Sequence, residues 1–175
     1  MLVLVVGPSG AGKDTLMDAA RAALSGEAGV RFVRREITRP ETAGGEAHLA
    51  VSEAEFVSRA AAGAYALHWR AHGLGYGIPA DIAEDLAAGR VVVANVSRAV
   101  LEEAASRFPV RVLEITAPVA VLAKRLAARG RESEADIAAR LARAVPLPAG
   151  LDVVSVFNDR SVDEGVAAVL AVLRG

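Results

Sequence analysis

The sequence predicts a three-layer α/β/α fold built on a parallel sheet, and three observations carry that prediction. Residues 2–6 form a continuous apolar run rich in β-branched side chains, which is typical of a strand buried on both faces. A glycine-rich segment and a helical apolar pattern follow this run directly. Further strand patterns then alternate with helical patterns to the end of the chain, as they do in parallel α/β sheets.

The individual elements follow from local patterns and from their caps. Five strands are expected, at 2–6, 30–37, 91–94, 110–116 and 153–157. Helices are expected at 12–24, 52–62, 80–88, 98–107, 118–129, 133–144 and 161–173. Ser52 with Glu55 three residues later is a capping box, and Pro118 opens its helix at a first-turn position. We expect one domain, residues 1–175, with 37–80 as an insertion and about 125–143 as an arginine-rich excursion.

Composition excludes several classes of protein. The chain has 175 residues, 53% of them hydrophobic and 23% charged, so it can bury a core and is too apolar to be disordered. No apolar run approaches the roughly 18 residues of a membrane span, and the first residues lack the basic region of a secretory signal. A net charge of −1 gives no general basic field for nucleic acid. We therefore expect a cytoplasmic protein without nucleic-acid or membrane partners, and a homodimer stays open.

The segment between the first strand and the first helix carries the most distinctive motif. Gly7-Pro8-Ser9-Gly10-Ala11-Gly12-Lys13 matches G-x-x-x-x-G-K in the strand-to-helix context of a phosphate-binding P-loop. Backbone N–H groups and the helix N-terminus would face phosphate oxygens, and Lys13 would reach the β- and γ-phosphates. The next position usually carries a hydroxyl that contacts Mg²⁺, but here it is Asp14, followed by Thr15. Asp14 either binds magnesium, directly or through water and with Thr15 as a second candidate, or only complements the helix dipole.

P-loops occur in GTPases, motors and small-molecule kinases, so other residues must decide the function. No N-K-x-D motif is present, and the strand 91–94 ends at Asn95 instead of the acidic residue typical of helicases and transporters. A short chain with several arginines near residue 130 favours a kinase that closes a lid over the transferring phosphoryl group. The residues alone therefore predict a small P-loop kinase.

Motifs along essentially the whole chain resemble the guanylate kinase family. They are the P-loop, Thr38-Arg39-Pro40 with Gly45-Glu46, Tyr76-Gly77-Ile78-Pro79, Arg125-Leu126, Arg129-Gly130-Arg131-Glu132 with Arg140-Leu141, and Phe157-Asn158-Asp159. The resemblance implies a P-loop NTPase fold with a five-stranded parallel sheet in the order 2-3-1-4-5, an acceptor-binding insertion and an arginine-rich lid. It also implies ATP as co-substrate and Mg²⁺ as its metal.

Departures from that family point to one branch of it. Thr42 stands where guanylate kinases have a second arginine, and Glu46-Ala47-His48 runs directly into residues 49–52. Gly-Lys-Asp in the P-loop, Arg35-x-Ile-Thr-Arg-Pro, Gly-Glu-x-His, His72-Gly-Leu-x-Tyr-Gly and Asn95-Val-Ser-Arg98 look like the ribose 1,5-bisphosphate phosphokinases of phosphonate degradation. This resemblance implies phosphorylation of ribose 1,5-bisphosphate by ATP to 5-phosphoribosyl diphosphate, with release of ADP.

Two alternatives differ in class from that function. One is a guanylate kinase or another nucleoside monophosphate kinase, which requires a pocket that reads a base. The other is a guanylate-kinase-like domain that only binds other proteins. Such modules typically lose the P-loop lysine, so the presence of Lys13 argues against the second alternative.

The expected site residues fall into three sets. Lys13, Asp14, Arg129, Arg131 and Arg140 are expected to act in catalysis, through charge neutralisation. Gly7, Pro8, Ser9, Gly10, Ala11, Gly12, Lys13, Asp14, Thr15, Arg125 and Asn158 are expected to bind ATP, with Asn158 near the adenine. Arg35, Arg39, Glu46, His48, His72, Tyr76, Asn95 and Arg98 are expected to bind the phosphorylated sugar, because its phosphates match guanidinium groups. An acceptor phosphate oxygen is itself a nucleophile, so no general base is required.

Several of these assignments have an alternative that the sequence leaves open. Arg34 and Arg35 alternate on a strand, so we expect at most one of them to face the site. Glu46 either holds a sugar hydroxyl or orients an arginine. The three histidines could form a metal site, but His68 and His72 share a face only on a helix, and Gly73 argues against a helix there.

Overall fold

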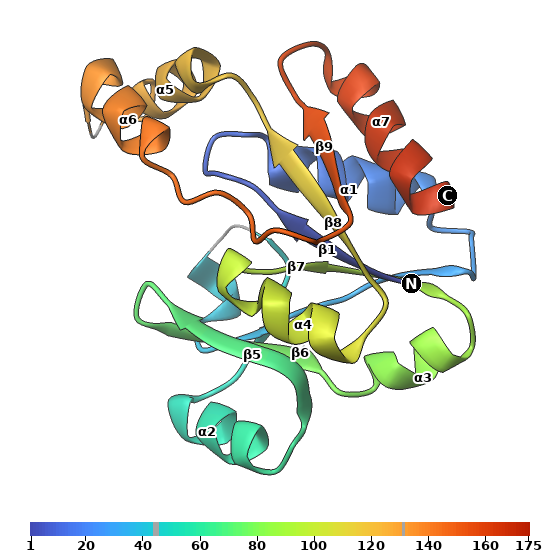
Figure 1. Cartoon of the computed structure of the whole chain (residues 1–175). Coiled ribbons are helices and arrows are strands. Elements are labelled where there is room, and N and C mark those ends of the chain that lie inside the picture. The colour runs from blue at the N-terminus through green and yellow to red at the C-terminus, as the bar shows by residue number, and fades with distance from the viewer. Residues whose placement is uncertain (44–45, 131) are drawn as a thin grey trace. The chain divides into compact units, whose positions relative to one another are not determined.

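Figure 1 shows the computed structural model of the chain, which describes residues 1–43, 46–130 and 132–175. Within these residues the chain forms seven α-helices, two 3₁₀ helices and nine strands in two sheets. Its contacts divide it into two compact units. The first unit is Met1–Leu4 with Glu27–Arg111, and the second unit is Val5–Gly26 with Val112–Gly175. Among the described helices, none is both long and apolar enough to cross a membrane.

The five-stranded parallel sheet has the order β2-β7-β1-β8-β9. Strand β2 (Val30–Phe32) pairs in parallel with β7 (Val91–Asn95), and β8 (Val110–Thr116) pairs in parallel with β9 (Val153–Phe157). Strand β1 (Leu2–Val6) is at most 1% exposed at every residue, as its unbroken apolar run predicts. The predicted α/β fold with a five-stranded parallel sheet is confirmed. The expected order 2-3-1-4-5 numbers only five strands. The observed labels differ from it because four further strands, β3–β6, lie between β2 and β7 in the chain.

The predicted strand over 30–37 is wrong in its extent. It divides between the two sheets: β2 has ended before Arg34, and β3 (Glu36–Ile37) belongs to a four-stranded sheet with the order β4-β3-β6-β5. The break occurs at Arg34 and Arg35, whose guanidinium groups bond to the segment that follows β3. That segment contains the short helix η1 (Glu41–Ala43) and the strand β4 (Leu49–Ala50).

Residues 64–80, for which no strand was expected, form a β-hairpin. Strand β5 (Tyr65–Ala71) pairs antiparallel with β6 (Leu74–Pro79), and Figure 1 shows the two as the long ribbon of this sheet. His72 and Gly73 form the two-residue turn, with φ of 53° and 73°. Two positive φ angles in succession match the right-handed twist of the flanking strands, which explains why a glycine stands at the second position. His68 therefore lies on a strand and not on a helix.

Two glycines of β6 are required by aromatic packing. A Cβ at Gly75 would lie 2.7 Å from the ring of Phe56, and a Cβ at Gly77 would lie 2.4 Å from the ring of Tyr65. The rings of Phe56 and Tyr65 pack on each other with centroids 5.5 Å apart. The same glycines weaken the strand pattern in the sequence, which is why the hairpin was not predicted.

A helix is present at each expected position. They are α1 (Lys13–Ala23), α2 (Glu53–Ala61), α3 (Ile82–Ala87), α4 (Leu101–Arg107), α5 (Val119–Ala127), α6 (Glu134–Ala142) and α7 (Val162–Arg174). The capping box of α2 is confirmed, because Ser52 Oγ accepts from the Glu55 N–H at 3.1 Å while Glu55 accepts from the Ser52 N–H at 2.9 Å. The helix expected from residue 98 begins as the 3₁₀ turn η2 (Arg98–Val100). In the second unit α7 packs along α1, and α5 packs against α6 (Figure 1).

The buried carboxylate of Asp85 links α3 to β2 and to the segment before β7 in the first unit. Asp85 in α3 is 6% exposed and accepts hydrogen bonds from Arg31 in β2 and from Arg90, just before β7. Arg31 also donates to Asp81 at 2.9 Å. The hydrogen bond from Arg31 is the main cause that holds the pKa of the Asp85 carboxyl below its usual value.

We expect Asp85→Asn to lower the free energy of unfolding by about 1–2 kcal/mol at neutral pH, because two partly solvated guanidinium groups lose their carboxylate. Since the folded-state pKa of Asp85 is lowered, its contribution is present above the unfolded-state pKa of about 3.9 and is lost as the pH falls through the folded-state value. Urea denaturation at neutral and acidic pH measures both effects. The exposed Asp81→Asn is the matched control, and an equal loss in the two variants would contradict the assignment.

Candidate active site

The P-loop lies in the second unit, between the end of β1 and the start of α1. Gly10 and Gly12 have φ of 85° and 78°, a region that side chains with a Cβ rarely adopt. Lys13 is the first residue of α1, and its Nζ donates to the Gly7 carbonyl at 3.4 Å. The loop therefore lies at a helix N-terminus, where backbone N–H groups and the helix dipole favour an anion.

Asn158 and Arg125 donate hydrogen bonds to backbone carbonyls of the P-loop. Asn158 is 7% exposed, and its Nδ2 donates to the Ala11 carbonyl at 2.7 Å. Arg125 donates to the carbonyls of Asn158 and Gly10, at 2.8 and 3.3 Å. Two side chains that were expected to bind ATP thus bond to the backbone that would hold its phosphates. Their contact with the nucleotide itself stays a prediction.

Asp14 and Thr15 occupy the first turn of α1, and both are exposed. A carboxylate at this place complements the positive end of the helix dipole. Carboxylate and hydroxyl oxygens are also ligands that Mg²⁺ accepts, so the donor set fits a magnesium ion at the P-loop. Both of the roles that the sequence left open for Asp14 agree with this placement.

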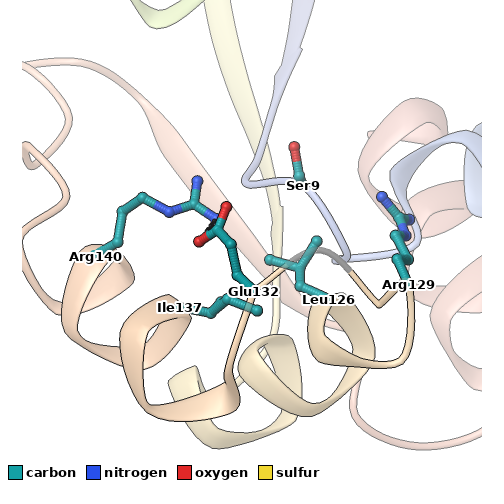
Figure 2. Close-up of a pocket in the computed structure, with 6 residues that line it drawn as sticks. All are labelled: Ser9, Leu126, Arg129, Glu132, Ile137 and Arg140. Atoms are coloured by element: carbon teal, nitrogen blue, oxygen red, sulfur yellow. Dashed lines mark ion pairs between the residues drawn. The ribbon is translucent and has the colours of Figure 1, made fainter.

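A cavity of about 470 Å³ opens between the P-loop and the helices α5 and α6. It is lined by Ser9, Leu126, Arg129, Glu132, Ile137 and Arg140. Figure 2 shows Ser9 on the loop with its hydroxyl directed away from Leu126, Arg129 on one side and the Arg140–Glu132 pair on the other. Arg140 Nη2 lies 3.6 Å from Glu132 Oε2. Two arginines and a loop hydroxyl around one cavity suit a phosphoryl group; Arg131, the third arginine expected there, lies outside the described residues.

In the first unit, Arg35 is enclosed by other residues that were expected to bind the acceptor. Glu46 accepts two hydrogen bonds from Arg35, both at 2.7 Å, and one from Asn95 Nδ2 at 2.9 Å. The Arg35 Cζ lies 5.0 Å from the ring centroid of Tyr76 and 5.9 Å from that of Trp69. These two rings are stacked, with centroids 5.3 Å apart. Glu46 therefore orients an arginine, which is one of the two roles considered for it.

His48 lies against Arg39 and is only 2% exposed. Its Nε2 lies 2.8 Å from the Arg39 carbonyl, and its Nδ1 lies 3.4 Å from Arg39 Nη2. Its own carbonyl accepts from Arg34 at 3.0 Å. Arg39 also lines a second cavity of about 430 Å³, next to Ser52 at the start of α2. Because His48 is buried, its ring cannot be a surface ligand for the acceptor in this conformation.

The remaining expected acceptor residues lie at the ends of elements. Arg98 begins η2 and is partly buried, three residues after Asn95 at the carboxyl end of β7. His72 is exposed at the hairpin turn. The hydrogen bonds and ring contacts given above for Arg35 and Arg39 are with residues other than His72. Its role as an acceptor ligand therefore stays a prediction without support from these contacts.

Known proteins resemble the chain over its whole length. The ribose 1,5-bisphosphate phosphokinase PhnN of Brucella melitensis is 52% identical over 170 residues, which cover 96% of this chain and 88% of that protein. The protein of the same name from Methylobacterium radiotolerans is 51% identical over 174 residues, covering 99% of this chain and 97% of that one. The chain belongs to the ribose 1,5-bisphosphate phosphokinase family. No general protein-family model matches it.

The fold of this family member also resembles a solved guanylate kinase. The crystal structure of guanylate kinase from Anaplasma phagocytophilum superposes with a TM-score of 0.70, covering 99% of this chain and 84% of that chain, at 17% identity. At that identity the likeness shows the fold alone. It agrees with the guanylate-kinase-like P-loop fold that the motifs predicted.

Two residues that pack against the candidate sites of this kinase-family member, Trp69 and Gly165, were not predicted from the sequence. Trp69 forms the stack with Tyr76 beside Arg35. Gly165 in α7 approaches Asn158 so closely that a Cβ would lie 3.1 Å from its Oδ1 and 2.9 Å from Leu16. Trp69 is the single tryptophan of the chain and lies seven residues before the Tyr-Gly motif, which was a usable signal for the first. No local signal marks Gly165, because its neighbours come from other parts of the chain.

Proposed function

We propose that the protein transfers the γ-phosphoryl group of ATP to ribose 1,5-bisphosphate, yielding 5-phosphoribosyl diphosphate and ADP. The identity of about half of all residues, over nearly the full length, to proteins named for this substrate carries the proposal. A phosphate-binding loop in one unit and an arginine-rich cluster in the other supply the two kinds of group that donor and acceptor need. The cysteine-free chain suits a cytoplasmic location.

The proposed chemistry needs little from the protein besides position and positive charge. An oxygen of the acceptor's 1-phosphate attacks the γ-phosphorus, the bond from that phosphorus to the β-phosphate oxygen breaks, and ADP leaves. In this scheme Lys13 and the P-loop backbone hold the donor phosphates, and Arg129 and Arg140 neutralise the transferring group. Arg39 holds an acceptor phosphate. Asp14 and Thr15 would hold Mg²⁺, which supplies charge neutralisation at the β- and γ-phosphates.

An acceptor panel tests this function. The purified protein with ATP and Mg²⁺ is given ribose 1,5-bisphosphate, GMP or AMP, and ADP release is followed in a coupled assay with an acceptor-free reaction as the blank. We expect the highest kcat/KM with ribose 1,5-bisphosphate, and a new diphosphate in the ³¹P NMR spectrum of the product. A preference for GMP would make the protein a guanylate kinase. No ADP above the blank with any acceptor would favour the binding module.

The metal role of Asp14 has its own expected result. We expect Asp14→Ser to move the Mg²⁺ dependence of kcat to higher concentration, because a hydroxyl attracts the cation less than a carboxylate does. Binding of ATP in EDTA should be as good or better, since a negative charge beside the phosphates is removed. Titration of kcat with Mg²⁺ in the wild type, Asp14→Ser and Asp14→Ala measures this. The same Mg²⁺ dependence in all three would show that Asp14 only complements the dipole of α1.

A further inference from the structure

One tripeptide contacts three arginines that precede it in the chain. Glu46 receives two hydrogen bonds from Arg35, and the carbonyl of His48 receives one from Arg34. The imidazole of His48 lies against Arg39. Residues 46–48 thus act on the arginines of residues 34–39, and His48 is the member that reaches the arginine proposed to hold the acceptor.

The contact of Nε2 defines where the hydrogen of the His48 ring lies. Nε2 is 2.8 Å from the Arg39 carbonyl oxygen, which can only accept, so Nε2 must donate. The bond restrains the backbone at Arg39, immediately before Pro40. Since the ring is 2% exposed, water cannot replace this partner at little cost.

The other ring nitrogen lies beside the guanidinium. Nδ1 is 3.4 Å from Arg39 Nη2, which can only donate, and 3.2 Å from the Glu46 carbonyl, which can only accept. A neutral ring with its hydrogen on Nε2 leaves Nδ1 as an acceptor for Arg39. A hydrogen on Nδ1 would instead direct that nitrogen to Glu46 and remove the acceptor from the guanidinium.

We infer that His48 is a positioning residue, which holds both the backbone and the side chain of Arg39 in the geometry that receives an acceptor phosphate. It does so through the Nε2–H bond to the Arg39 carbonyl and through the packing of its ring against the guanidinium, and it makes no contact with the substrate. An arginine side chain loses considerable rotamer freedom when it binds a ligand, and a guanidinium that is already restrained loses less on binding. The inference rests on the proposed function in that Arg39 is taken as an acceptor ligand.

Nitrogen NMR of the unliganded protein tests the tautomer without any substrate. Long-range ¹H–¹⁵N spectra of the three histidines are recorded at neutral pH, and the His48 signals are assigned by their absence in His48→Gln. We expect a protonated Nε2 for His48, because that nitrogen donates to the Arg39 carbonyl. An unprotonated Nε2 would overturn the inference, because the bond that restrains Arg39 would then be absent.

Steady-state kinetics test the positioning role. We expect His48→Leu to raise the KM for the acceptor roughly tenfold, which corresponds to one buried hydrogen bond to a charged group, while the KM for ATP changes less than about twofold. His48→Gln keeps an amide N–H that can reach the Arg39 carbonyl, so it should recover part of the loss. Ile78→Val, a buried change in β6 of the same unit, is the matched control and should leave both KM values unchanged.

A double-mutant cycle separates positioning from a general effect on the fold. In an Arg39→Ala background, His48→Leu should add less than about a twofold change in the acceptor KM, because there is no guanidinium left to position. Losses that multiply independently would overturn the inference. The cycle uses whichever acceptor the panel selects, so a failure of the proposed substrate and a failure of the positioning role give different results.

Discussion

Lys13→Met is expected to lower kcat by roughly 100- to 10,000-fold, because one charge aimed at a transferring phosphoryl group supplies stabilisation of that order. Methionine keeps most of the apolar stem and removes the charge that Nζ carries at the start of α1. ATP binding should weaken much less than kcat falls, since the backbone N–H groups of the P-loop remain. Saturation kinetics and calorimetric ATP titration measure the two quantities.

Lys124→Met is the matched control for Lys13→Met. Lys124 is the only other lysine of the chain and lies exposed on α5. We expect Lys124→Met to alter kcat less than about twofold, as surface changes usually do. A loss below about tenfold in Lys13→Met would show that Lys13 does not stabilise the transferring group.

Arg39→Ala is expected to lower kcat/KM for the acceptor roughly tenfold or more while leaving the KM for ATP nearly unchanged. A hydrogen bond to a charged group in a closed site contributes on the order of 1.5–3 kcal/mol, which sets that size. The prediction takes Arg39 as the acceptor ligand because its side chain lines the cavity of about 430 Å³ in the first unit. Initial rates with each substrate varied in turn provide the measurement.

Arg70→Ala is the matched control for this second change. Arg70 lies on β5 of the same unit, is half-exposed and pairs with Glu53 at the surface. We expect both KM values to be unchanged in Arg70→Ala, because exposed ion pairs contribute little. If Arg39→Ala also leaves the acceptor kcat/KM unchanged, Arg39 does not bind the acceptor.

The features that the sequence predicted correctly depend on interactions between residues that are close together in the chain. Strand β1 was evident because every one of its residues is apolar, and the P-loop because its glycines and lysine are contiguous. The capping box of Ser52 involves a partner only three residues away. In each case the residues that interact are neighbours in the chain, so their spacing alone indicates the structure.

The hairpin β5–β6 and the division of residues 30–37 between two sheets were decided by tertiary contacts. Gly75 weakens the strand pattern, yet the ring of Phe56 from a preceding helix needs the space beside it. Arg34 and Arg35 look like strand residues, but their guanidinium groups bond to residues 11 to 14 positions further along the chain. Pairing and packing of this kind depend on which surfaces meet, and no local pattern encodes that.

The same distinction applies to the site. The sequence by itself predicted which residue types serve phosphate chemistry: a P-loop lysine, lid arginines and an arginine-rich acceptor segment. Only the tertiary structure decided how the polar residues pair. Glu46 and His48 could each have contacted a sugar, but the fold brings Arg35 to the Glu46 carboxylate and encloses the His48 ring against Arg39. Asn158 likewise bonds to the P-loop backbone, because the fold brings the end of β9 to Ala11.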